Sequence, residues 1–143
     1  MRNQEPVNKN ATNEAKKLLS YLCEIEGNGI ISGQHTQTKP MEETCYIAEH
    51  TGKTPKLYGF EMLAYSPNIN YSDMTSPCLK EILENRQTMQ TAIKMGLEGK
   101  IVTLSFHWYS PLGGRDKSFY AENTDFDPSK VLVEGTPERN AFY

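Results

Sequence analysis

The chain alternates between segments whose apolar residues recur at helical spacing and short segments that are densely apolar. The first helical segment begins after Thr12, which is placed as an N-cap, and ends at Gly27. This spacing predicts an amphipathic helix, whose apolar positions are Ala15, Leu18, Leu19, Leu22 and Ile25.

Two later segments are also predicted to be helical. Residues 41–50 have a helix-compatible composition and stop before Gly52. Ser76 and Pro77 form an N-cap and first-turn pair, and apolar residues then follow at mostly helical intervals up to the region of Gly96 and Gly99. The second stretch therefore predicts one long helix.

Three short apolar segments predict strands. GIISG, residues 29–33, is too short for a helix, so we expect a strand that ends near Ser32 and runs into Gln34 and His35. A second strand is expected in the centre of residues 54–65, and a third in KIVTLSF, residues 100–106.

Helices and strands therefore alternate, and each connection between strands is long enough to contain a helix. This order is typical of βαβ units and predicts an α/β fold with a parallel sheet in chain order. A long loop follows over residues 108–130, and Thr136 and Pro137 then mark the start of another helix. Three strands leave an open edge and an uncovered face, so we expect more chain or self-association through that edge to cover them.

Composition and charge narrow the class of protein. The 143 residues carry 15 basic and 18 acidic side chains, and neither sign gathers into a long run, which argues against a nucleic-acid partner. No stretch approaches the roughly 20 apolar residues that cross a bilayer, and the amino terminus lacks an apolar signal-peptide core. We expect residues 1–11 to be a flexible lead-in and residues 12–143 to be one folded portion. The cysteines Cys23, Cys45 and Cys78 are isolated and odd in number, and we expect half-buried thiols.

Polar and aromatic residues follow each predicted strand. The first strand leads into Gln34 and His35, the second into Glu61 and Tyr65, and the third into His107, Trp108 and Tyr109. In parallel α/β folds the carboxyl ends of the strands gather the functional groups, so we expect a binding face there.

Each of these residues also has a plainer interpretation. Either histidine could be structural, Trp108 could anchor the core rather than stack on a ligand, and Glu61 could serve an ordinary ion pair. A metal site built from His35, Glu61 and His107 is an alternative, although no local His pair enforces ligand geometry. We expect no cofactor.

Five stretches in this order resemble the amino-terminal part of glycoside hydrolase family 26, whose best-known members are endo-β-1,4-mannanases. They are IISGQH, LYGFEMLAYSP, VTLSFHWYSPLGG, DKSFYAENTDFD and GTPERNAFY. The resemblance implies the first three βα units of an incomplete (β/α)8 TIM barrel, which needs about 250 residues when whole.

The same resemblance implies an enzyme that hydrolyses β-mannan or a related β-glycan with retention, using two glutamates. By the family pattern one glutamate follows the fourth strand and the other lies near the seventh, both beyond Tyr143, so the chain alone is expected to be inactive. Full-length members are often secreted, which leaves localisation open.

The resemblance carries over residue by residue only on the substrate-binding side. His107 matches the histidine that the family places near the scissile sugar, and Trp108 adjoins it. At Glu61 the family pattern more often has aspartate, so the chain departs from it there. A small carbohydrate-binding or interaction domain is the non-enzymatic alternative.

Overall fold

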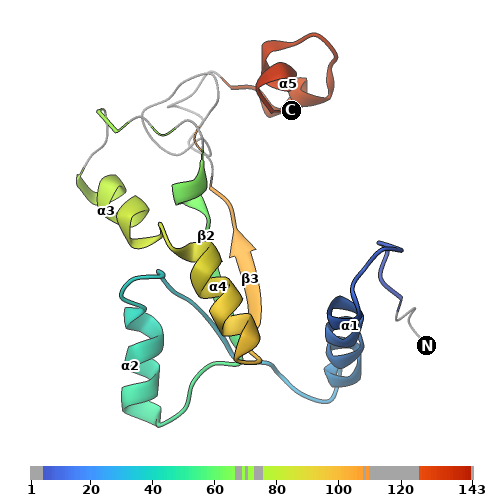
Figure 1. Cartoon of the computed structure of the whole chain (residues 1–143), viewed down its shortest axis with the longest axis vertical. Coiled ribbons are helices and arrows are strands. Elements are labelled where there is room, and N and C mark those ends of the chain that lie inside the picture. The colour runs from blue at the N-terminus through green and yellow to red at the C-terminus, as the bar shows by residue number, and fades with distance from the viewer. Residues whose placement is uncertain are drawn as a thin grey trace. The chain divides into compact units, whose positions relative to one another are not determined.

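A computed structural model of the protein describes residues 5–66, 69, 71–72, 76–107, 109 and 126–142 (Figure 1). The chain divides into two compact units, Met1–Ser32 and Gly33–Tyr143, and each is described separately below.

The first unit contains the amphipathic helix expected from the sequence. Helix α1 spans Asn13–Ile25, and the Thr12 hydroxyl accepts a hydrogen bond from the Ala15 amide at 3.2 Å, as an N-cap does. Gly27 follows with φ +79°, a left-handed conformation that suits glycine at a helix end. Both expected boundaries are therefore confirmed. No described helix of either unit is long and apolar enough to cross a membrane.

The second unit is built on the parallel sheet that the sequence predicts. The described strands are β1 (Gly33–His35), β2 (Leu57–Glu61) and β3 (Ile101–Ser105), and they pair in parallel in the order β1-β2-β3. The predicted order and direction of the strands are confirmed.

The predicted bounds of the first strand were wrong. The apolar residues Ile30 and Ile31 lie before the strand, and pairing begins at Gly33, which sits opposite Leu57. The two backbones approach closely here, because a Cβ on Gly33 would lie 3.0 Å from the Leu57 side chain. Close backbone approach, rather than apolar density, sets the start of β1.

Helices α2 (Glu42–Thr51) and α4 (Thr88–Leu97) contact this sheet, and Figure 1 shows α4 lying across β2 and β3. Tyr58 and Phe60 of β2 are buried against Met95 of α4, with Val102 beside them. Full burial of a side chain such as Phe60 stabilises the fold by about 1.5–3 kcal/mol. Helix α2 ends at Gly52 with φ +67°, as expected.

The expected long helix is instead two helices, α3 (Ser76–Glu84) and α4, with a corner at residues 85–87. The Asn85 side chain donates to the Glu81 carbonyl at 2.9 Å, and the Thr88 amide donates to the Asn85 carbonyl at 3.3 Å. Side-chain bonds such as that of Asn85 compete with the regular backbone hydrogen bonds of a helix, so they favour the end of α3 at this point. A second apolar cluster is formed by Leu63 of the 3-10 helix η1 (Leu63–Tyr65), Ile82 of α3 and Tyr109.

The described carboxyl-terminal segment contains the 3-10 helix η3 (Pro128–Leu132) and the helix α5 (Pro137–Phe142). The Thr136 hydroxyl accepts from the Arg139 amide at 3.3 Å, so the expected cap is confirmed. Lys130 pairs at 3.5 Å with the buried Glu138, which ties η3 to α5.

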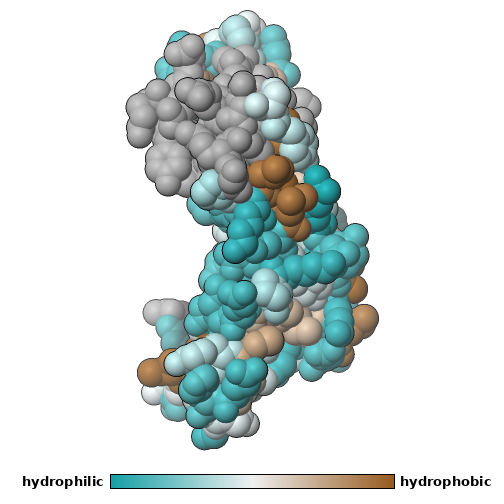
Figure 2. Space-filling model, turned by 90° about the vertical axis from the view of Figure 1, so that its left-hand side faces the viewer, coloured by the Kyte–Doolittle hydropathy of each residue, from teal (hydrophilic) through white to brown (hydrophobic). Residues whose placement is uncertain are grey.

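The thiols and the surface differ in part from expectation. Cys23 is partly buried, but Cys45 is exposed on α2 rather than half-buried; Cys78 has no described side chain. The face in Figure 2 is largely hydrophilic with a few hydrophobic patches. Exposed apolar side chains of the second unit include Ile93 and Leu97 on α4, and Leu104 and Phe106 on and after β3.

Candidate functional site

The candidate site lies on the sheet face opposite the Tyr58–Phe60 core. Side chains alternate along a strand, so Gly59 and Glu61 share this face, and the parallel register places Thr103 and Ser105 beside them. A hollow of about 430 Å³ lies here. Its lining includes His35 and Ser105 together with Gly33, Leu57, Gly59 and Thr103.

Glu61, the last residue of β2, is the most heavily bonded side chain of this face. Its Oε1 accepts from the backbone amides of Leu63 and His107, both at 2.9 Å. Its Oε2 accepts from the Ser105 hydroxyl and lies 2.6 Å from His107 Nδ1, with the hydroxyl also at 2.6 Å. An ionised carboxylate offers about four acceptor positions, so these partners fill them.

The environment keeps Glu61 ionised even though the residue is only 5% exposed. Burial acts to raise the pKa of Glu61, but the bonds from Ser105 and from the amide and ring of His107 outweigh it and lower the pKa below its usual value. Glu61 is thus a carboxylate at neutral pH and acts as a hydrogen-bond acceptor, not as an acid.

The backbone of Glu61 is fixed from two sides. Thr88, the fully buried first residue of α4, donates its hydroxyl to the Glu61 carbonyl at 2.7 Å. The next amide, that of Met62, donates to the Ser105 carbonyl at 2.8 Å. The carboxylate is therefore anchored on rigid elements rather than on a loop.

His107 follows β3 and reaches the surface, its side chain being 47% exposed. Because the Glu61 carboxylate can only accept, the short contact at Oε2 requires the proton to be on His107 Nδ1. In the neutral ring Nε2 is then the acceptor, which is the arrangement of a histidine oriented by a carboxylate.

His35 also belongs to this face, but it lies within β1 rather than after it. It is in register with Gly59, and a Cβ on Gly59 would lie 3.4 Å from His35 Cα, Cβ and Cγ. The small residue thus makes room for His35 to extend across β2. His35 Nε2 comes within 3.4 Å of the Ser105 hydroxyl on β3.

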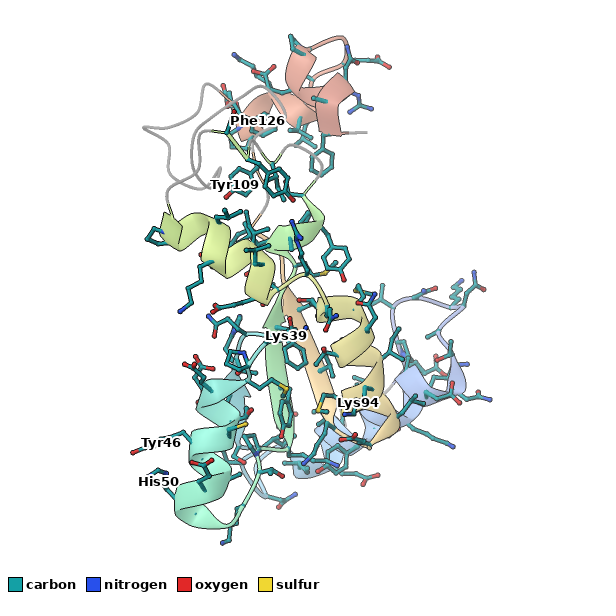
Figure 3. All side chains as sticks on the ribbon, turned by 60° about the vertical axis from the view of Figure 1, so that its left-hand side comes forward. Lys39, Tyr46, His50, Lys94, Tyr109 and Phe126 are labelled. Atoms are coloured by element: carbon teal, nitrogen blue, oxygen red, sulfur yellow. The ribbon has the colours of Figure 1, made fainter. Side chains whose placement is uncertain are left out.

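Two of the aromatic residues expected at the binding face lie elsewhere. The Tyr65 hydroxyl contacts the Arg86 carbonyl and the Met89 amide, both at 3.2 Å, at the corner between α3 and α4. Tyr109 is buried in the second apolar cluster (labelled in Figure 3), and its amide donates to Ser66 Oγ at 2.7 Å. These bonds indicate structural roles. Trp108 lies outside the described residues.

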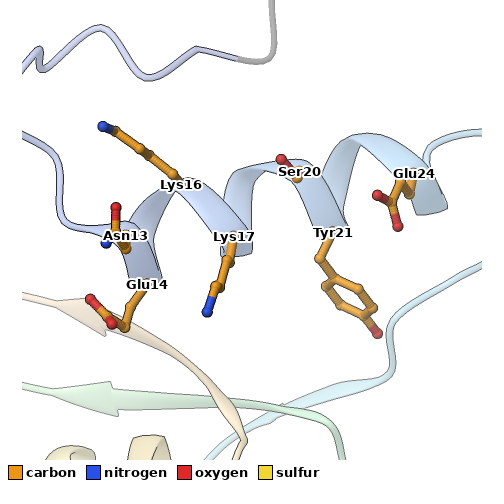
Figure 4. Close-up of a pocket in the computed structure, with 7 residues that line it drawn as sticks. All are labelled: Asn13, Glu14, Lys16, Lys17, Ser20, Tyr21 and Glu24. Carbon is orange, nitrogen blue, oxygen red and sulfur yellow. The ribbon is translucent and has the colours of Figure 1, made fainter.

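The described residues contain no group of three potential metal ligands, so His35, Glu61 and His107 do not form one. The geometry gives the reason: the Glu61 oxygens are already filled by donors from Leu63, Ser105 and His107. A second hollow of about 520 Å³ lies along α1 and is lined mainly by charged side chains such as Lys16, Lys17 and Glu24 (Figure 4). It carries none of the candidate residues.

Sequence reasoning missed two residues of the site, Ser105 and Thr88. Ser105 lies two residues before His107, so the strand period puts it on the same face, and this period was the available signal. The contact of Thr88 with Glu61 joins residues 27 apart in sequence and has no local signal.

Comparison with known proteins assigns the family. Residues 7–141 match the sequence profile of glycosyl hydrolase family 26. A mannan endo-1,4-β-mannosidase of Thermothelomyces thermophilus is 28% identical over 137 residues, which are 91% of this chain and 26% of that protein.

Solved structures show the same likeness. A β-(1,4)-mannanase of Podospora anserina is 32% identical with a TM-score of 0.76, and a ruminal endo-β-1,4-mannanase is 27% identical with a TM-score of 0.74. In both cases the match covers 98% of this chain and 30% of the other. The family 26 domain of an endo-β-mannanase/endo-β-glucanase from Prevotella bryantii is 26% identical, with a TM-score of 0.68, over 98% of this chain and 42% of that one.

The chain thus spans about a quarter to two fifths of the length of these relatives. Its α/β fold with a three-stranded parallel sheet is similar to part of their structures. With the profile matched from residue 7 to residue 141, the chain belongs to glycosyl hydrolase family 26.

Proposed function

We propose that this chain forms one side of the substrate cleft of a retaining endo-β-1,4-mannanase. Residues 12–143 would be the amino-terminal portion of the catalytic barrel, with β1, β2 and β3 as its first three strands and residues 1–11 as a lead-in. The observation that carries the proposal is the strand-end position of His107, held by the ionised Glu61 in a protein of this family.

His107 would bind a hydroxyl of the sugar next to the scissile bond. The bond at Nδ1 orients the ring, and the side chain is half exposed at the end of β3. Trp108, the next residue in the chain, would add a stacking surface, and His35 would contribute from β1 on the same face. Tyr65 remains a weaker candidate, because its hydroxyl is engaged at the corner between α3 and α4.

The chain would bind but not hydrolyse mannan by itself. Retaining hydrolysis requires a carboxylic acid that protonates the leaving oxygen and a second carboxylate that attacks the sugar carbon. Glu61 suits neither role, because its pKa is lowered and both of its oxygens are engaged by donors. By the family pattern the two catalytic glutamates would follow the fourth strand and lie near the seventh strand of the barrel.

Sugar titration monitored by NMR tests the binding proposal. A β-1,4-mannohexaose titration should shift the ring signals of His107 and leave those of His50 unchanged, because His50 lies on α2 and bonds the Tyr46 carbonyl. His107→Ala should abolish the shifts at neighbouring strand ends, whereas His50→Ala should not. Equal shifts with an α-linked glucan, or none with mannohexaose, would contradict the proposal.

A further inference from the structure

The Oε2 atom of Glu61 accepts from two donors at the carboxyl end of β3, and both lie at a similar distance from it. Ser105 Oγ and His107 Nδ1 both lie at 2.6 Å from it. Ser105 is in register with Glu61 across β2 and β3, and His107 follows two residues later. The two donors therefore define the direction of this oxygen together.

The hydroxyl proton of Ser105 points to Glu61. Two acceptors are within reach, the Glu61 carboxylate at 2.6 Å and the Phe60 carbonyl at 3.3 Å. The shorter bond to a charged oxygen is the stronger one, so the proton goes to Glu61. Ser105 Oγ is then left to accept, and His35 Nε2 lies 3.4 Å from it. Ser105 thus donates to the carboxylate, and His35 of β1 contacts the Ser105 hydroxyl.

We propose that Ser105 is a positioning residue for His107, which acts by holding the Glu61 carboxylate so that Oε2 keeps the proton on Nδ1 of the ring. The backbone amides of Leu63 and His107 both bond Oε1, so they fix only one of the two carboxylate oxygens. If the Ser105 hydroxyl is removed, the described donor that still bonds Oε2 is the half-exposed ring of His107. Oε2 could then move relative to the ring, and the contact that orients the ring and selects its Nδ1–H tautomer would weaken.

This inference deepens the proposed function, since the value of an oriented His107 rests on its binding of sugar. The positioning itself is a property of the sugar-free chain and can be tested without any glycan. Failure of the mannohexaose titration and failure of the positioning test are therefore separate results.

The test is the tautomeric state of His107 in ¹⁵N-histidine-labelled chain, read from long-range ¹H–¹⁵N correlations. Spectra are taken through a pH series, and the tautomer is read on the alkaline plateau where the His107 signals no longer change with pH. The wild-type ring should be almost entirely the Nδ1–H tautomer with a slowly exchanging Nδ1 proton. Ser105→Ala should raise the Nε2–H fraction severalfold and accelerate the exchange of that proton.

Two further variants separate positioning from packing. Ser105→Thr keeps the hydroxyl and should retain the wild-type tautomer. Thr103→Ala is the matched control, two residues earlier on the same face of β3, and should leave His107 unchanged. If Ser105→Ala does not fold, Ser105→Cys replaces it, since a thiol keeps the shape but donates weakly. A folded Ser105→Ala or Ser105→Cys chain with the wild-type tautomer and exchange rate would overturn the proposal.

Discussion

Glu61 Oε2 lies 2.6 Å from His107 Nδ1, and this contact joins the carboxyl ends of β2 and β3. The carboxylate is almost fully buried, whereas the ring is half exposed. The buried charge of Glu61 can therefore orient the His107 ring, which faces the solvent. This arrangement suits a glutamate at position 61. The glutamate side chain, which is one methylene longer than that of aspartate, contacts two backbone amides, a hydroxyl and an imidazole ring at once.

Acid should destabilise the chain through Glu61. The folded-state pKa of this group is lowered below that of the unfolded chain, where glutamate titrates at about 4.3. The unfolded state then binds the proton more readily, so stability from this group is fully present above the unfolded value and is lost as pH falls through the folded one. Urea unfolding measured from pH 7 down to pH 3 should show the decline.

Glu61→Gln supplies the control for that decline. The variant cannot titrate at this position, so its stability should depend less on pH over the same acid range. It should also be less stable at pH 7 by about 1–3 kcal/mol, because an amide NH₂ would replace an acceptor that faces buried donors. An equally steep acid decline in wild type and variant would show that other carboxylates cause it.

Thr88→Val should destabilise the second unit through the backbone of β2. The substitution keeps the shape of the side chain but removes the hydroxyl that lies 2.7 Å from the Glu61 carbonyl and 2.9 Å from the Asn85 carbonyl. A buried carbonyl that loses its side-chain partner costs about 1–3 kcal/mol. Thr91→Val, a partly buried position on the same helix, controls for the change in helix propensity and should cost much less in denaturant unfolding.

The sequence was sufficient for β2 and β3 and for their order, because apolar density and the length of the connections are local properties. It was insufficient for β1, because Ile30 and Ile31 are more apolar than the residues that pair. What fixes β1 is the closeness of Gly33 to Leu57, a contact between residues distant in the chain. The break at Asn85 was overlooked for a different reason, since helical spacing continues across it.

The candidate site shows the same division. Strand-end positions identified His35, Glu61 and His107, and the structure brings all of them to one face through Ser105. Tyr109 follows β3 as expected, but its side chain is buried in the second apolar cluster. The residues that bury Tyr109 lie on η1 and α3, far from it in the sequence, so no local pattern predicts this contact.

Exposed apolar surface should make the chain self-associate and bind a hydrophobic dye. Ile93 and Leu97 lie exposed one turn apart on α4, and Leu104 and Phe106 are exposed at the β3 edge. Sedimentation velocity should show concentration-dependent association, and Ile93→Lys with Leu97→Lys should reduce both association and dye fluorescence. Glu98→Lys, an exposed change on the same helix end, controls for added charge. A monomer that binds little dye would contradict this prediction.

The purified chain should release no reducing ends from β-mannan and no phenol from an aryl β-mannoside. The physical reason is that general acid catalysis needs a group that holds a proton near neutral pH, and the lowered pKa of Glu61 makes it a poor one. A sensitive reducing-end assay measures the activity. If any activity is found, Glu61→Gln shows whether Glu61 contributes to it. Activity that is equal in wild type and Glu61→Gln would come from a contaminant or from other residues. Activity that disappears in Glu61→Gln, while the variant stays folded by circular dichroism, would show that Glu61 takes part in the chemistry and that its role is not limited to holding His107.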